Sequence, residues 1–192
     1  MKTFSSLIAI AVVSAVAVVA HAEKATKEVK SGLQVGKLIG AFYVTKCAGA
    51  EDDGVDVGEN LCYRCKYGGR PQVMIFTRSS DEVVGELVSG LETAIEEHAD
   101  KELSAIVNLL GEDKDDLSDD AKKFAKASKA KAVPVVVPNE FENGPENYGL
   151  NPDAAVTVIL AEGGKVKANH AVASSEDLDV EAILADIATI VE

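Results

Sequence analysis

The stretch LCYRCKYGGRPQVMIFTR, residues 61–78, contains the segment that decides the fold, QVMIFT at residues 72–77. This segment is a nearly continuous apolar run of strand length, which is typical of a strand buried on both faces. Ser79 or Ser80 can then cap a helix, and apolar residues at helical spacing follow in residues 83–95. The sequence therefore predicts a central strand that leads directly into a helix.

Apolar and polar segments alternate through the rest of the chain in the same way. Their order is strand, strand, helix, strand, helix, strand, hairpin, helix, which predicts an α/β protein with a mixed β-sheet flanked by helices. The other expected strands are residues 41–45, 103–111, 132–138 and two strands around Gly163-Gly164 within 154–172; the other expected helices are 118–130, capped by Ser118 or Asp119, and a last helix capped by Asp177 or Asp179.

The N-terminus has the pattern of a secretory signal peptide. Lys2 precedes the apolar run of residues 7–20, which is shorter than a membrane-spanning helix and ends in Ala20-His21-Ala22. We therefore predict a signal peptide at 1–22, a short charged leader at 23–32 and a single domain at 33–192. The mature protein is expected to be exported, periplasmic or secreted, with no membrane span.

The chain is acidic, with 19 Lys and Arg against 32 Asp and Glu and a net charge of −13. A field of this sign repels nucleic acid and anionic membrane surfaces, so neither is an expected partner. The sequence has no phosphate-binding loop and no Ser-His-Asp grouping, and we predict no cofactor. An exported protein meets an oxidising compartment in which disulfides persist.

Three segments carry a resemblance to a known fold: LQVGKLIGAFYV at 33–44, AVPVVVPNEFE at 132–142 and NYGLNPDAAVTVILAEGGKV at 147–166. Together with the order of the elements, they resemble the thioredoxin-like fold. Within it, they resemble the branch of peroxiredoxins and alkyl hydroperoxide reductase-like proteins. The resemblance covers most of residues 33–192.

The resemblance implies where catalytic residues should lie. Thioredoxins carry a Cys-x-x-Cys, and peroxiredoxins a cysteine, in the turn after the central strand. The equivalent turn here, residues 77–82, contains no cysteine, so a typical peroxidase activity is not expected. In this fold a proline beside the active-site turn is often cis, so the resemblance implies a cis bond at Val133–Pro134, with Val137–Pro138 as the second candidate.

The chain does contain a Cys-x-x-Cys, Cys62 and Cys65, but it precedes the central strand. Three interpretations remain open. The pair is a reversible dithiol that exchanges disulfides with protein partners, or a structural disulfide in a non-catalytic binding or scaffold protein, or a soft-metal site completed by Cys47 or a histidine. By analogy with other such pairs, Cys62 would attack the partner's disulfide and Cys65 would resolve the mixed disulfide.

The charges around the pair favour the redox interpretation. No acidic residue occurs between Glu59 and Asp81, and this window contains Arg64, Lys66, Arg70 and Arg78. Nearby cations lower the pKa of a thiol and favour the thiolate. Residues 66–71 have loop composition, so no helix N-terminus is expected to assist. Cys47 is expected in the loop after the first strand, either as a resolving thiol or as an incidental cysteine.

Overall fold

The computed structural model describes residues 29–192, so the predicted signal peptide at 1–22 and most of the leader lie outside the described residues. It contains one mixed sheet with strand order β2-β1-β5-β4-β3-β6-β7. The elements are β1 (Val44–Ala48), β2 (Asn60–Leu61), α1 (Tyr63–Tyr67), β3 (Gln72–Thr77), α2 (Glu82–Glu97), β4 (Ser104–Leu109), α3 (Lys114–Ala127), β5 (Val135–Pro138), β6 (Val156–Glu162), β7 (Lys165–Val172), α4 (Val180–Ala185) and α5 (Ala188–Val191).

The predicted central strand is confirmed as β3. It pairs in parallel with β4 and antiparallel with β6, and every one of its residues is buried. Gln72 lies opposite Ser104 and Ala161, and Thr77 lies opposite Leu109 and Val156. Because β3 is hydrogen-bonded on both edges and covered on both faces, it holds the adjoining loops, residues 68–71 and 78–81, at its two ends.

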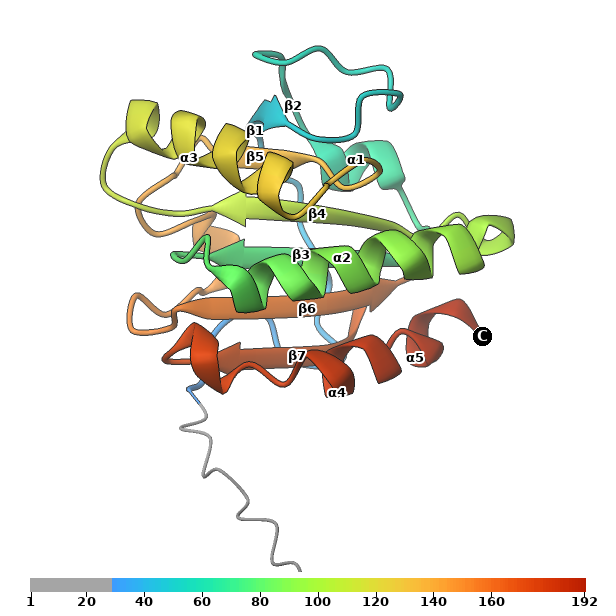
Figure 1. Ribbon diagram of the computed structural model, residues 1–192. Coiled ribbons are helices and arrows are strands. Elements are labelled where there is room, and N and C mark those ends of the chain that lie inside the picture. Colours follow the sequence, from blue (N-terminus) through green and yellow to red (C-terminus); the bar gives the residue numbers. More distant parts are fainter. Residues whose placement is uncertain (1–28) are drawn as a thin grey trace, which may run out of the picture.

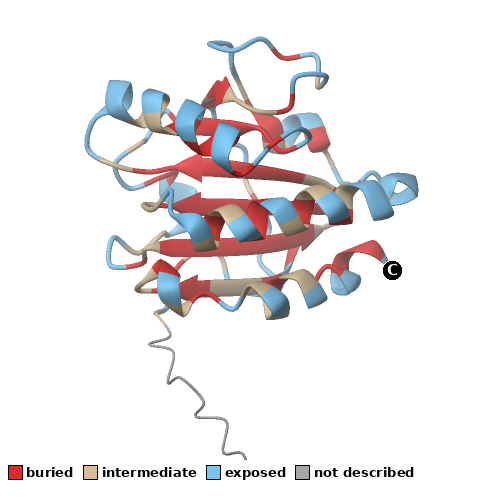
Figure 2. Ribbon diagram, in the orientation of Figure 1, coloured by how far each residue is buried: buried red, intermediate tan, exposed pale blue. Residues whose placement is uncertain are grey.

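The two faces of the sheet are covered differently. Helices α2, α3, α4 and α5 pack on one face, and the chain before β1 crosses the other face together with α1 (Figure 1). Side chains from both faces of the sheet are buried, whereas the outer sides of the helices are exposed (Figure 2). We call these the helical face and the α1 face.

Packing begins before residue 33, within the predicted leader. Ser31 is buried, and its hydroxyl lies 2.7 Å from the Thr157 hydroxyl, while the Gly32 N–H donates to the Gly149 carbonyl at 3.1 Å. Within residues 29–192, no helix is both long enough and apolar enough to cross a bilayer.

Several helix ends differ from the prediction because aspartates, rather than serines, take the N-cap positions. Asp81 caps α2 by accepting the Val84 N–H, and Asp113 caps α3 by accepting the N–H groups of Asp115 and Asp116. Helix α3 therefore begins at Lys114, four residues before the predicted start. The last helix begins after Asp179, one of the two predicted caps.

Candidate functional site

The Cys62–Cys65 pair forms a disulfide at the start of α1, with an S–S distance of 2.07 Å and a Cα–Cα distance of 5.2 Å. Cys62 is the N-cap of this five-residue helix, and its sulfur accepts the Cys65 N–H at 3.1 Å. The prediction that no helix begins at the pair was therefore wrong. Cys62 is buried, with 8% of its surface exposed, whereas Cys65 is exposed.

Tertiary contacts hold α1 in place, because a helix of five residues has little stability of its own. The Tyr67 hydroxyl donates to the Ala105 carbonyl in β4 at 3.1 Å, and the rings of Tyr63 and Tyr67 pack together in the core of the α1 face. Gly68 ends the helix with φ = 65°, a left-handed conformation that glycine adopts without strain. The chain then turns into β3.

A buried network ties α1 to the acidic loop after β1. Lys46 is 2% exposed, and its Nζ donates to the Ala50 and Val55 carbonyls and to Asp53 Oδ1, at 2.7, 2.8 and 2.8 Å. The other oxygen of Asp53 accepts the hydroxyl of Tyr63 at 2.5 Å. All three N–H groups of the Lys46 ammonium are thus paired. Through Asp53, the network also fixes Tyr63 of α1 to the loop.

Burial and hydrogen bonding set the ionisation of this network. Burial opposes ionisation of Asp53, but the hydrogen bonds from Lys46, Tyr63 and the Val55 N–H, with the charge of Lys46, hold the pKa of this carboxyl below its usual range. Burial, followed by the bond to Asp53, raises the pKa of Tyr63, so its hydroxyl remains a donor. This network could not be predicted from the sequence, since lysine is rarely buried.

Three of the four predicted cations lie on α1 or in the turn directly after it. Arg64 and Lys66 lie on α1, and Arg70 lies in the turn after it, where it contacts Glu102 at 3.5 Å with both side chains well exposed. Arg78 lies at the opposite end of β3 and donates to the Glu142 carbonyl at 2.6 Å. We call Arg64, Lys66 and Arg70 the α1 cations.

The disulfide does not reach the turn that follows β3. The pair lies at the start of α1 and precedes β3 in the chain, whereas Ser79 and Asp81 lie in the turn that follows β3. Asp81 is held there by the hydroxyls of Ser79 and Ser175, which lower its pKa although burial acts in the other direction. This turn is a helix cap without a thiol.

Cys47 lies within β1 and not in the predicted loop. It is buried in the core of the helical face, where its Sγ lies 3.7 Å from the Ser118 hydroxyl, whereas Tyr63 and Tyr67 of α1 belong to the core of the other face. The sheet therefore separates Cys47 from the disulfide. Burial raises the pKa of the Cys47 thiol, which further lowers its reactivity.

We predict that Cys47 does not react with iodoacetamide in the folded protein, because its thiol is buried and protonated. Mass spectrometry after labelling should show no adduct in buffer and one adduct in guanidinium. After reduction of the folded protein, Cys65 should be labelled before Cys47. Labelling of native Cys47 at the rate of a free peptide thiol would contradict its placement.

Pro134 lies directly before β5, and no cis peptide bond occurs in residues 29–192, so the implied cis bond at Val133–Pro134 or Val137–Pro138 was wrong. The Pro134 carbonyl accepts the Val107 N–H at 3.0 Å, which continues the parallel pairing of β5 with β4. The residue before β5 is thus part of the sheet and does not form a bend beside a catalytic turn.

Within residues 29–192, neither His98 nor His170 joins the cysteines in a metal site. His98 is the C-cap of α2, and His170 on β7 contacts Asp186 at 2.8 Å. Among the described residues, no three His, Cys, Asp or Glu side chains are grouped so that they could hold a metal ion.

The arrangement of the sheet and helices is that of a thioredoxin-like fold, as the sequence predicted. The chain is similar to AhpC from Mycobacterium tuberculosis, with 14% identity and a TM-score of 0.61 over 82% of this chain and 92% of that one. It is also similar to peroxidoxin BcpB from Mycobacterium tuberculosis, with 14% identity and a TM-score of 0.56 over 82% and 98% of the two chains.

A third similar structure is the thioredoxin domain of a thiol-disulfide oxidoreductase from Bacteroides vulgatus, with 13% identity and a TM-score of 0.56 over 83% of this chain and 99% of that one. No protein-family model matches the sequence, and neither does any curated protein. At these identities the similarity establishes the fold, and the activity has to be argued from the site.

Proposed function

We propose that the protein exchanges disulfides with partner thiols through Cys62 and Cys65. The observation that carries this proposal is the unequal exposure of the pair. Cys65 is accessible to a partner, whereas Cys62 is buried at the N-cap of α1, where its sulfur accepts the Cys65 N–H. An N–H donor and nearby cations stabilise a thiolate, which makes Cys62 a good leaving group.

The reaction runs in two steps that move two electrons to the pair. A partner thiolate attacks the Cys65 sulfur, the Cys62–Cys65 bond breaks, and Cys62 leaves as a thiolate. A second partner thiolate then attacks the partner's sulfur in the mixed disulfide, which forms the partner's disulfide and releases the Cys65 thiolate. This order reverses the roles expected from the sequence, because Cys65 is the exposed member.

A structural disulfide in a non-catalytic binding or scaffold protein is the second candidate. It is favoured by the position of the pair at the start of α1, before β3 in the chain, since thioredoxins and peroxiredoxins place their cysteines in the turn after the central strand. The two candidates differ in reduction potential, since structural disulfides in exported proteins lie below about −300 mV and exchanging pairs lie well above it.

The deciding measurement is the reduction potential of the pair in glutathione buffers, read by acid quench and mass spectrometry. We expect a value between about −270 and −120 mV, the range of exchanging pairs. The Cys62→Ser variant should accumulate a mixed disulfide at Cys65 with a partner peptide, and Cys65→Ser should not. A potential below about −300 mV, or equal trapping by both variants, would exclude the exchange proposal.

We also propose that the protein is exported, which is supported by the apolar run at 7–20 followed by Ala20-His21-Ala22. A disulfide is stable in the oxidising compartment that such a protein enters. N-terminal sequencing of protein recovered from an extracytoplasmic fraction should begin at Glu23. Recovery only from the cytoplasm with residues 1–22 intact would contradict export.

A further inference from the structure

Two of the α1 cations have no acidic partner. Arg64 and Lys66 flank Cys65 on α1, and neither forms an ion pair within residues 29–192. Of the acids nearby, Asp53 is already held by Lys46 and Tyr63, and Glu102 contacts Arg70. In a chain with a net charge of −13, the exposed Cys65 is thus flanked along α1 by two cations that form no ion pair among these residues.

Arg64 also has unused hydrogen-bonding capacity. Its Nε is buried without a partner, and its Nη2 lies so close to the β6–β7 turn that a Cβ on Gly164 would be 3.3 Å away. The positive charge of Arg64 reaches the hydroxyl of Tyr148, where it opposes the upward pKa shift caused by burial. Buried donors are almost always paired, so an unpaired one indicates a missing polar partner.

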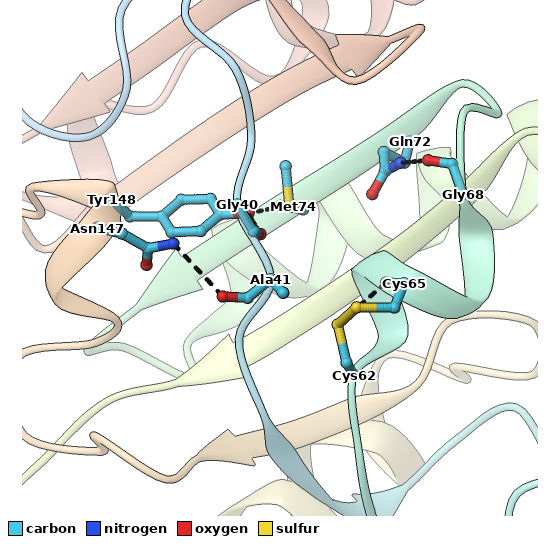
Figure 3. The surroundings of a disulfide bond; sticks show 9 residues. All are labelled: Gly40, Ala41, Cys62, Cys65, Gly68, Gln72, Met74, Asn147 and Tyr148. Atoms are coloured by element: carbon cyan, nitrogen blue, oxygen red, sulfur yellow. Dashed lines mark hydrogen bonds between the residues drawn. A yellow bond between two sulfur atoms is a disulfide. The ribbon is translucent and has the colours of Figure 1, made fainter.

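A second unpaired group lies on the same face. Gln72 is fully buried and donates to the Gly68 carbonyl, but its Oε1 has no partner. Figure 3 shows this oxygen turned away from Gly68, on the face that also carries the disulfide and Tyr148. This oxygen is an acceptor, so the partner that it lacks is a hydrogen-bond donor, whereas the Arg64 Nε lacks an acceptor.

A cavity beside α1 has room for a small polar group. A cavity of about 300 Å³ is lined by Lys66, Arg70, Tyr67 and Ser104 together with Asp53. Since the carboxylate of Asp53 is neutralised by Lys46 and Arg70 contacts Glu102, the unpaired charge that this cavity presents to a ligand is that of Lys66. Lys66, which follows Cys65 on α1, is thus accessible to an anion.

We propose that the thiol that exchanges with Cys65 is anionic, with a carboxylate close to its sulfur that Arg64 and Lys66 bind. This inference rests on the exchange reaction proposed above. A guanidinium binds a carboxylate through two parallel hydrogen bonds, and the ammonium of Lys66 adds a second positive charge. The carboxylate places the partner's thiolate against Cys65, after which the bond changes are those already described.

The test compares three small thiols on the oxidised wild-type protein: 3-mercaptopropionate, 2-mercaptoethanol and cysteamine. Second-order rate constants for opening the disulfide are measured by acid quench and mass spectrometry and expressed per thiolate. We expect the anionic thiol to react about tenfold faster than the cationic one at low salt, with the difference shrinking at high salt. Circular dichroism checks that each variant is folded.

Variants identify the residues responsible. Arg64→Gln and Lys66→Gln should each reduce the preference for 3-mercaptopropionate about threefold or more, and Arg64→Lys should retain part of it. Lys126→Gln is the matched control, since it removes one exposed charge from α3 on the helical face and should leave the preference unchanged. Comparing the peptides Glu-Cys-Glu and Lys-Cys-Lys shows whether the preference extends to a polypeptide partner or is confined to small thiols.

The outcomes separate this inference from the proposed function. If all three thiols open the disulfide at equal rates, or if neither Arg64→Gln nor Lys66→Gln changes the preference, the anionic partner is excluded while exchange stands. If no thiol opens the disulfide, the exchange reaction fails and the anionic partner fails with it.

Discussion

Replacing Lys46 with methionine is expected to destabilise the protein by about 3–5 kcal/mol, because breaking one partner of a buried ion pair leaves the other charge unpaired. Methionine fills a similar volume but donates no hydrogen bond, so Asp53 and the carbonyls of Ala50 and Val55 lose their shared donor. The free energy of unfolding should be measured by urea denaturation followed by circular dichroism.

Two control variants test whether the loss of stability comes from the buried charge. Lys46→Met combined with Asp53→Asn should recover part of the lost stability, because no charge then remains unpaired. Lys122→Met breaks the exposed pair with Asp119 and should cause no measurable change. A Lys46→Met variant as stable as wild type would show that the ammonium is not needed to hold the loop.

Acidification should affect the same network. The folded pKa of Asp53 is lowered, so its contribution is present above the ordinary aspartate pKa and is lost as the pH falls through the lower, folded value. The free energy of unfolding of the wild-type protein should therefore decrease as the pH is lowered through this acidic range. The double variant carrying Lys46→Met and Asp53→Asn should lack this part of the pH dependence.

Replacing Gly49 with alanine is expected to cost roughly 2–4 kcal/mol, from a left-handed backbone and an overpacked site together. Gly49 has φ = 71°, and an added Cβ would lie 2.3 Å from the Val133 carbonyl oxygen. The backbone there cannot move aside easily, because the Glu92 carboxylate accepts the N–H groups of residues 131–133.

Gly54→Ala is the matched control for Gly49→Ala. Gly54 has φ = 74°, nearly the same backbone conformation, but nothing lies within 4 Å of its added Cβ. It should therefore lose only the cost of the left-handed conformation, about 1–2 kcal/mol. Equal unfolding free energies for the two variants, measured in urea, would show that the contact with Val133 has no energetic importance.

The sequence was sufficient for the elements whose patterns are local. The apolar run at 72–77 and the Gly163-Gly164 hairpin lie where they were predicted, because burial on both faces and a tight turn each leave a distinct pattern. The position of Cys62 and Cys65 before the central strand was predicted in the same way. These features depend on residues that are neighbours in the chain.

The missed features depend on contacts between distant segments. Helix α1 is too short to show helical periodicity and is held by the contacts of Tyr63 and Tyr67. Lys46 is polar and gave no signal for burial, because its three acceptors come from a loop whose conformation the composition does not specify. The unequal exposure of Cys62 and Cys65 arises in the same way, from how α1 packs.

The disulfide of Cys62 and Cys65 closes a ring of only four residues. So short a ring removes little conformational entropy, worth about 2 kcal/mol by the chain-entropy relation. The sheet and its two cores do not depend on that contribution, and the loop beside α1 is held by Lys46. The protein should therefore remain folded in both oxidation states, which the exchange proposed for the pair requires.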